Sequence, residues 1–304
     1  YNLFWVVSLK TKLLIFLIML LIFQVSFSVN HNSRVFSQDI NDIRVFLQSK
    51  ILDVNCIIKQ QTINSYSRSI YKNNVPDCVY SPPVLGDVNN DSMLEIIVGA
   101  GWSVCCLNSQ DLSKIWEFKT GGWVYSSPAL GDVDNDGKLE VIFGSDDYYV
   151  YCLNGEDGSL LWYFYAGYYV ETAPALGDVD GDGKLEVVIG CWDYCVYCLN
   201  GENGSLLWKY KTNEIIESSP TLGDVDNDGK LEVIFGSDDC HIYCLNGEDG
   251  SLLWYFSTDN WVRSSAALGD VDNDGKLEVI IGSFGGYIYG LNGEDGSLGW
   301  KYKT

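Results

Sequence analysis

Hydrophobic and polar positions follow the same order in five consecutive units between Val79 and Thr304. Residues 124–169 represent the pattern, because they hold four short segments rich in β-branched and aromatic residues, separated by polar stretches with Asn-Gly, Asp-Gly and clustered Asp. Segments of this length and composition are typical of β-strands, and the polar stretches are typical of tight turns. The strands are expected at Ser127–Asp132, Leu139–Gly144, Tyr148–Leu153 and Leu160–Tyr165.

The connections between the expected strands are too short for a crossover, so the four strands of a unit should form an antiparallel meander. The second, third and fourth segments are apolar or aromatic on both alternating faces. Such a sheet has to lie between two others; radial stacking around an axis provides this for every unit, whereas a two-layer sandwich would leave one face polar. The sequence therefore predicts an all-β fold, a β-propeller of four-stranded antiparallel blades. The five repeat units are residues 79–123, 124–169, 170–215, 216–261 and 262–304, which form either a whole ring or part of a larger one.

The first 78 residues lie outside the repeat. Lys10 and Lys12 precede an apolar run, 13–23, and a short segment with small residues follows, an order typical of a secretory signal peptide. A membrane anchor is the alternative, because residues 1–7 are also apolar, but the uninterrupted run is shorter than the roughly 18 to 20 residues that span a bilayer. We expect residues 1–28 to be a signal peptide or anchor and 29–78 a spacer. The repeat region would then be secreted, or extracellular and held to the membrane only by that anchor.

The charge of the chain limits its partners. It contains 41 Asp and Glu against 19 Lys and Arg, which gives a formal net charge of −22. A protein that binds nucleic acid needs a basic face for the phosphates, so nucleic acid is excluded as the expected partner.

The ten cysteines mostly follow the repeat and do not suggest a disulfide framework. Four of them occupy one equivalent position in the first four units, where a small buried apolar residue is expected. Cys195 and Cys198 resemble a metal-binding pair, but three residues apart on a strand they point to opposite faces, which argues against zinc. Cys56 and Cys78 could form a disulfide. The four equivalent cysteines are Cys106, Cys152, Cys198 and Cys244.

An acidic segment close to GDVDNDGKLEV recurs in all five units, starting at Gly86, Gly131, Gly177, Gly223 and Gly269. Counted from the first Asp, carboxylates stand at loop positions 1, 3, 5 and 9, a Gly at position 6 permits a sharp reversal, and the main-chain carbonyl of position 7 offers one more oxygen. Alternate carboxylates in a tight loop converge on one point, which is how calcium gathers its six to eight oxygen ligands, whereas magnesium keeps several waters.

The alternative is a plain turn without an ion, because Asp, Asn and Gly favour turns in any case. However, carboxylates a few ångströms apart repel each other by about 1 kcal/mol per pair even in water, and a turn does not need that repulsion. The first loop departs from the pattern with Asn89 and with Ser92 in place of Gly, so its site should be weaker. The expected ligands, with position 7 contributing only its carbonyl, are Asp87, Asn89, Asp91, Met93 and Glu95; Asp132, Asp134, Asp136, Lys138 and Glu140; Asp178, Asp180, Asp182, Lys184 and Glu186; Asp224, Asp226, Asp228, Lys230 and Glu232; and Asp270, Asp272, Asp274, Lys276 and Glu278.

These segments resemble a known repeat family. GDVDNDGKLEVIFGS and its variant at residues 86–100 are similar to the FG-GAP or VCBS-type repeat of integrin α-subunit propellers and of many secreted bacterial and archaeal proteins. LNGEDGSLLWKY-like segments, such as Leu199–Tyr210, resemble the tryptophan segment of quinoprotein-like propeller repeats. The resemblance covers residues 79–304 and implies a propeller whose acidic loops bind calcium. It does not imply one activity, because these propellers carry many functions.

The repeated tryptophans of the fourth strand are expected between blades, whereas four other tryptophans near strand ends could form an aromatic rim or simply pack. The first group is Trp116, Trp162, Trp208, Trp254 and Trp300, and the second is Trp102, Trp123, Trp192 and Trp261.

We expect a non-catalytic cell-surface interaction or adhesion module with a protein or glycan ligand. The alternative is a carbohydrate-active or quinone-dependent enzyme on the same fold. Its candidate residues would be the vicinal pair Cys105 and Cys106, or the unit-specific polar residues His241, Arg263, Glu171 and Glu217.

Overall fold

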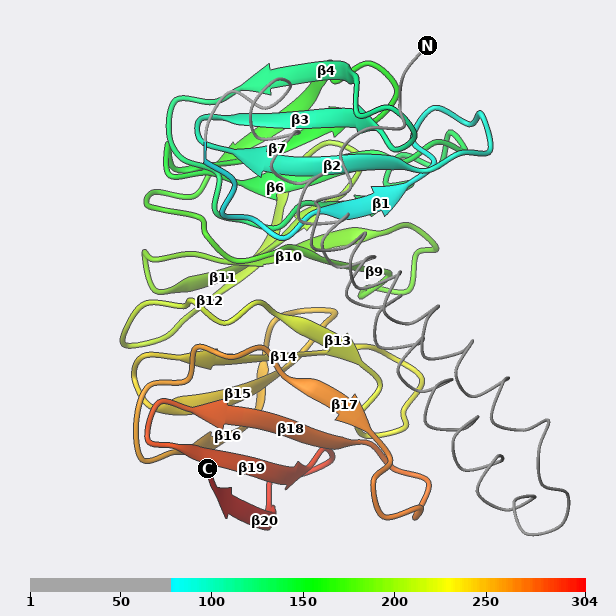
Figure 1. The fold of residues 1–304 in the computed structure, drawn as a ribbon. Helices are drawn as coiled ribbons and strands as arrows, with labels where there is room; N and C mark the ends of the chain where they lie inside the picture. Colours follow the sequence, from blue (N-terminus) through cyan, green and yellow to red (C-terminus); the bar gives the residue numbers. More distant parts are fainter. Residues whose placement is uncertain (1–77) are drawn as a thin grey trace, which may run out of the picture. The chain divides into compact units, whose positions relative to one another are not determined.

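The computed structural model describes residues 78–304, which form five four-stranded antiparallel β-sheets (Figure 1). The predicted signal or anchor, nearly all of the spacer, and Cys56 lie outside the described residues. Within residues 78–304, no helix has the length and hydropathy to cross a membrane.

Each sheet is a meander, in which strands that are consecutive in sequence are neighbours in the sheet. The predicted strands of the second unit are confirmed, except that the first is shorter than expected: it covers Ala129–Gly131 and pairs with three residues of the second strand. The strands of the five sheets in order are β1 (Val84–Gly86), β2 (Glu95–Ala100), β3 (Ser103–Asn108), β4 (Lys114–Lys119); β5 (Ala129–Gly131), β6 (Glu140–Gly144), β7 (Tyr149–Asn154), β8 (Leu160–Tyr165); β9 (Ala175–Gly177), β10 (Glu186–Gly190), β11 (Cys195–Asn200), β12 (Leu206–Lys211); β13 (Thr221–Gly223), β14 (Glu232–Ser237), β15 (His241–Asn246), β16 (Leu252–Ser257); and β17 (Ala267–Gly269), β18 (Glu278–Ser283), β19 (Tyr287–Asn292), β20 (Leu298–Lys303).

Consecutive sheets pack face to face, and Figure 1 shows them following one another in chain order. The first strands lie innermost, because β1 contacts β5, β5 contacts β9 and β9 contacts β13. The core is divided into layers between sheets: one layer joins Val196 and Cys198 of the third sheet to Phe235 and Leu245 of the fourth. The four equivalent cysteines are buried as predicted. Cys195 belongs to the layer on the other side of the third sheet, which confirms that it and Cys198 point to opposite faces.

A tryptophan of each fourth strand joins its sheet to the next one. The indole N–H of Trp208 donates a hydrogen bond of 2.7 Å to the carbonyl oxygen of Gly247, in the turn between the third and fourth strands of the next sheet. Gly250 of the same turn has a φ of +71° and lies against the Trp208 ring, where a Cβ would come within 2.5 Å of a ring carbon. The equivalent bonds are Trp116 to Gly155, Trp162 to Gly201 and Trp254 to Gly293. The predicted position between blades is therefore confirmed for these four tryptophans.

The far face of the fifth sheet is different, because no described sheet covers it. Trp300 is 41% exposed, against 8% for Trp208, and Tyr302 next to it is also exposed. A Cβ on Gly269 would meet no atom within 4 Å, whereas one on Gly223 would meet Leu268 of the next sheet. A place between blades requires a following sheet, and none of the described sheets follows the fifth, so the position expected for Trp300 stays a prediction. The described sheets do not close a ring by packing the first against the fifth.

Replacing Trp208 with Phe tests the role of the indole bond. The change leaves the buried carbonyl of Gly247 without its donor and removes part of a packed ring, so we expect the free energy of unfolding to fall by about 1–3 kcal/mol. The matched control Trp300→Phe should change it by less than about 0.5 kcal/mol. Urea denaturation followed by circular dichroism measures both, and equal losses in the two variants would contradict this account.

Candidate metal centre

Each acidic loop connects the end of an inner strand to the start of the second strand. In the second unit, Asp132 directly follows β5 and Glu140 is the first residue of β6. Gly131 and Glu140 are partners in the antiparallel register of these two strands. Strand pairing therefore fixes the two ends of the loop next to each other, so that loop positions 1 and 9 lie close together.

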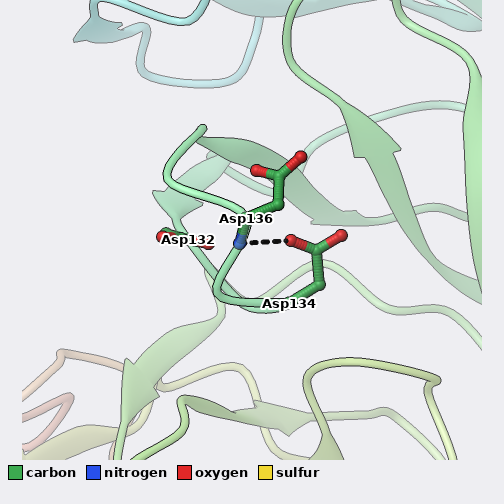
Figure 2. Close-up of side chains that lie close together, drawn as sticks. All are labelled: Asp132, Asp134 and Asp136. Carbon is green, nitrogen blue, oxygen red and sulfur yellow. Dashed lines mark hydrogen bonds between the residues drawn. The ribbon is translucent and has the colours of Figure 1, made fainter.

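The loop folds around its own carboxylates (Figure 2). The N–H of Asp136 donates to Asp134 Oδ1 at 3.1 Å, the N–H of Gly137 to Asp132 Oδ2 at 3.0 Å, and the N–H of Lys138 to Asp136 Oδ1 at 2.8 Å. Two residues of this reversal have a positive φ, Asn135 at 60° and Gly137 at 84°. Gly at position 6 and Asn at position 4 suit this geometry, since both adopt the left-handed conformation more readily than other residues.

In four of the five loops, carboxylate oxygens of three residues lie within 4.8 Å of one another. The structure thus brings together predicted ligands that are two or more residues apart in sequence. These groups are Asp132, Asp134 and Asp136; Asp178, Asp180 and Glu186; Asp224, Asp226 and Glu232; and Asp270, Asp272 and Glu278. In the first loop, Asn89 provides an amide oxygen at position 3 and accepts the N–H of Asp91 at 2.9 Å, like the aspartates of the other loops.

The closing glutamate is buried at the base of the loop. Glu95, Glu140, Glu186 and Glu232 are each at most 1% exposed. One carboxylate oxygen accepts the main-chain N–H of loop position 2, as in the 2.8 Å bond from Val225 to Glu232 Oε2. Burial raises the pKa of Glu232 from its ordinary 4.5 to about 7, against the lowering effect of the Val225 bond, and the neighbouring aspartates raise it further. Glu140 and Glu186 behave in the same way, with pKa values of about 7.

Several of the clustered oxygens are buried without a hydrogen-bond donor. They include Oδ1 of loop position 1 in the second, third and fourth units, and Oε1 of the closing glutamate in the first and third. A buried carboxylate oxygen without a partner is strongly unfavourable, so these atoms indicate a missing positive charge. The donor set consists of hard oxygens, which suits a divalent cation such as calcium. The residues therefore fit the predicted ion. The buried oxygens without a donor in the loops are Asp132 Oδ1, Asp178 Oδ1, Asp224 Oδ1, Glu95 Oε1 and Glu186 Oε1.

The lysine at position 7 directs its side chain away from the cluster. Lys138 Nζ forms an ion pair of 2.7 Å with Glu156, and Lys184 forms one of 2.5 Å with Glu202. Lys230 pairs with Glu248 and Lys276 with Glu294 in the same way. These pairs are exposed and add little stability. They do keep the ammonium group out of the loop. The contribution of the main-chain carbonyl of position 7 stays a prediction.

A second cluster of charges lies before the inner strands, at the opposite end from the acidic loops. Arg263 donates two hydrogen bonds to Asp238, of 3.0 and 2.6 Å, and its third nitrogen lies 2.9 Å from Glu217. Burial raises the pKa of Glu171 to about 7, and Asp146 and Glu217 raise it further. The sequence singled out Arg263, Glu171 and Glu217 as specific to their units but missed Asp238 and Asp146. They stand in turns between second and third strands, and no local pattern links those turns to the cluster.

Comparison with known proteins agrees with the repeat pattern. The FG-GAP-like repeat family matches residues 132–189, 178–235 and 224–281. The repeated acidic clusters are consistent with calcium sites of that family. No curated protein sequence matches the chain.

Solved structures show the same type of fold. The biofilm matrix protein Bap1 of V. cholerae matches with a TM-score of 0.60 and 22% identity, over 77% of this chain and 41% of Bap1. The quinohemoprotein alcohol dehydrogenase of Comamonas testosteroni matches with 0.59 and 14%, over 76% of this chain and 43% of the enzyme. BamB of Moraxella catarrhalis matches with 0.51 and 14%, over 74% and 67%. The chain thus spans less than half the length of the first two, and these likenesses show the fold alone.

The raised pKa of the closing glutamate predicts a pH dependence in the presence of a chelator. A folded-state pKa of about 7 against an ordinary 4.5 means that the folded state binds the proton more tightly, so the contribution of Glu232 to stability is lost as the pH rises from about 4.5 to about 7. Glu232→Gln should match the wild type at pH 4.5 and be more stable by about 1–3 kcal/mol at pH 8. Urea denaturation at both pH values measures the difference. A variant that is less stable than the wild type at pH 8 would refute the prediction.

Proposed function

Because the chain carries three FG-GAP-like repeats within a propeller-like series of sheets, we propose that it is a calcium-binding β-propeller that acts as a non-catalytic interaction or adhesion module at the cell surface. The observation that carries the proposal is the set of buried carboxylate oxygens without a donor in the acidic loops. Those atoms belong to the first and ninth loop positions, the same positions that strand pairing holds together.

Calcium would be held by the side-chain oxygens of positions 1, 3, 5 and 9, with the carbonyl of position 7. When bound, the ion supplies positive charge to a group of carboxylates that otherwise repel one another. The chain's own part is to hold those oxygens in place: the loop N–H groups orient the aspartates, and the buried glutamate fixes the start of the second strand. The result is a rigid loop at one end of every sheet, on which a partner can bind without an ordering penalty.

A non-catalytic role is supported by the state of the candidate catalytic groups. Burial raises the pKa of the Cys105 and Cys106 thiols to about 12, which keeps them protonated and unreactive at neutral pH. Arg263 is engaged by two carboxylates, and the Nδ1 atom of His241 lies 2.8 Å from the carbonyl oxygen of Asp239. The enzymatic alternative draws on the likeness to quinohemoprotein alcohol dehydrogenases, which concerns the fold.

The proposed partner is a protein or a glycan outside the cell. Two tryptophans of the predicted rim, Trp102 and Trp261, are exposed, and Trp261 stacks against Arg263 at 4.6 Å. Trp123 and Trp192 are partly buried among tyrosines, so their role is packing. The exposed pair offers ring surface to a ligand at the end opposite the acidic loops, because aromatic rings combine apolar area with fixed geometry.

Calcium should stabilise the folded protein. Binding to the native state raises the free energy of unfolding by about 2.7 kcal/mol per site when free calcium is 100 times the Kd. We therefore expect the melting temperature to rise when calcium replaces chelator, as measured by scanning calorimetry. A melting temperature that is the same in calcium and in chelator would contradict the proposed calcium binding.

The variant Asp226→Asn distinguishes the role of position 3 as a calcium ligand from its role in the turn. The first loop already has Asn89 at this position with the same hydrogen bond to the residue two places on, so the turn should persist. In chelator the variant should be as stable as the wild type or slightly more stable, because one repulsive charge is lost; in calcium its gain should be smaller, because affinity follows the charge of the ligands. Asn89→Asp should change both quantities in the opposite direction. Equal calcium responses in the three proteins would contradict the assignment of position 3.

Surface labelling tests the location independently. On intact cells that produce the protein, an antibody against residues 79–304 should bind, and external protease should remove the signal. A signal that appears only after the cells are permeabilised would refute the cell-surface role and leave the calcium sites untouched.

A further inference from the structure

Arg263 shows how this protein holds a cation at the junction of the fourth and fifth sheets. Its guanidinium group donates hydrogen bonds of 3.0 and 2.6 Å to the two oxygens of Asp238, and its third nitrogen lies 2.9 Å from Glu217. The same group lies 4.6 Å from the ring centroid of Trp261 and 5.3 Å from that of Phe284. Charge-assisted hydrogen bonds and cation–π contacts therefore act together on one guanidinium group. We call the four residues around Arg263 the occupied site.

The junction of the second and third sheets repeats this arrangement, beginning with the aspartate. Asp146 and Asp238 lie in equivalent turns, between the second and third strands of the second and fourth sheets. The main-chain N–H of Asp146 donates to the carbonyl oxygen of Trp123 at 2.8 Å, and that of Asp238 donates to Ile215 at 3.0 Å. Trp123 and Ile215 are themselves equivalent positions of the repeat. The two aspartates are therefore attached at the same place in their sheets.

An aromatic pair of the third unit corresponds to the two rings that flank Arg263. Tyr169 and Trp192 stand at the positions of Trp261 and Phe284. Their ring centroids are 5.6 Å apart, against 6.2 Å for the pair around Arg263. In both pairs the main-chain N–H of the second residue donates to the carbonyl oxygen of the first, at 3.0 Å from Trp192 and 2.8 Å from Phe284. The second junction thus has the aromatic faces of the occupied site.

The cation is the part that the second junction lacks, because Glu171 stands at the position of Arg263. Within residues 78–304, the carboxylates of Asp146 and Glu171 form no ion pair and accept no hydrogen bond, and Asp146 Oδ1 is buried. Burial raises the pKa of Asp146 to about 6 and that of Glu171 to about 7. The charge of Asp146 raises the pKa of Glu171 further, and Arg263 offsets this only in part. Two shielded carboxylates without a counter-charge are unfavourable, so a positive group is missing here.

From this internal comparison we infer that the junction of the second and third sheets binds the guanidinium group of a ligand, in the place that the Arg263 side chain fills in the occupied site. Asp146 accepts two N–H groups of the ligand, as Asp238 does from Arg263. Glu171 supplies the second carboxylate. Tyr169 and Trp192, which pack against each other, offer their faces to the plane of the guanidinium group. The inference concerns a ligand other than calcium and holds whether or not the chain acts at the cell surface.

A guanidinium ion suits this site better than a metal ion does. It is planar and weakly hydrated, it donates two parallel hydrogen bonds to a carboxylate, and it stacks on aromatic rings. Calcium requires six to eight oxygens, which two carboxylates among aromatic rings do not provide. A ligand can approach, because Glu171, Tyr169 and Trp192 are all partly exposed. A glutamate side chain is also shorter than that of arginine, so Glu171 leaves room for the group that Arg263 carries itself.

Titration of the full chain with methylguanidinium chloride tests the inference, with the NMR signal of the Trp192 indole N–H as the readout. Calcium and about 0.15 M NaCl are present to screen general attraction to the negative chain. We expect one site with a Kd of about 1 mM, which is weak because the probe is small. Methylammonium chloride should bind at least about tenfold more weakly, because an ammonium group cannot donate two parallel bonds to one carboxylate.

Glu171→Arg supplies the cation from within the chain, as Arg263 does in the occupied site. This variant should raise the Kd for methylguanidinium at least about tenfold and raise the melting temperature by about 2–4 °C, because it forms an ion pair with Asp146. Asp146→Asn should weaken binding by a similar factor without raising the melting temperature. The matched control is Glu214→Arg, the same change of charge at an exposed position outside the site. It should leave the Kd within about twofold.

Arg263→Ala provides a further test, because it empties the occupied site. A second methylguanidinium ion should then bind, and it should shift the indole N–H signal of Trp261. The inference would be overturned by a wild-type Trp192 signal that does not move up to about 20 mM methylguanidinium. Equal binding of methylammonium would overturn it, and so would an affinity that Asp146→Asn leaves unchanged. A loss of binding in Glu214→Arg as large as in Glu171→Arg would show general attraction to negative charge in place of a site.

Discussion

A glutamate buried at the first residue of each second strand connects the acidic loops to the sheets. Glu232 begins β14, accepts the N–H of Val225 inside the loop, and takes part in the group of oxygens formed with Asp224 and Asp226. Its charge is almost completely shielded from water, so the charged form requires a compensating cation. The same residue therefore takes part both in the strand pairing at the base of the loop and in the charge cluster of that loop.

The sheets depend on a second constraint, which is that both of their faces are apolar. A layer such as the one between the third and fourth sheets is closed by Trp208, whose ring covers the layer while its N–H reaches the next unit. Because this bond always runs toward the C-terminal neighbour, each unit supplies a ring to the sheet after it and a turn to the sheet before it. Each sheet is thus stabilised by its contacts with the adjacent sheets, as expected for repeat proteins.

Local and repeated features, including the tryptophans between sheets, could be predicted from the sequence, whereas contacts specific to single units could not. The strands and the acidic loops follow from alternation, Asn-Gly turns and the spacing of Asp, all of which act within a few residues. Trp254 and Trp300 occupy equivalent positions of the repeat, but only Trp254 is buried in the described sheets, because burial depends on a neighbouring sheet and not on the local sequence. The pairing of Arg263 with Asp238 escaped prediction for a related reason: the two residues are 25 positions apart and belong to different units.

The indole bond spans the same 39 residues at every junction. A duplicated whole repeat unit, inserted at any junction, would receive a tryptophan from the unit before it and offer its own to the unit after it. Gain or loss of a whole unit by recombination therefore leaves every remaining junction satisfied, whereas a deletion of part of a unit breaks two at once. The protein can therefore lengthen or shorten during evolution in steps of one whole unit.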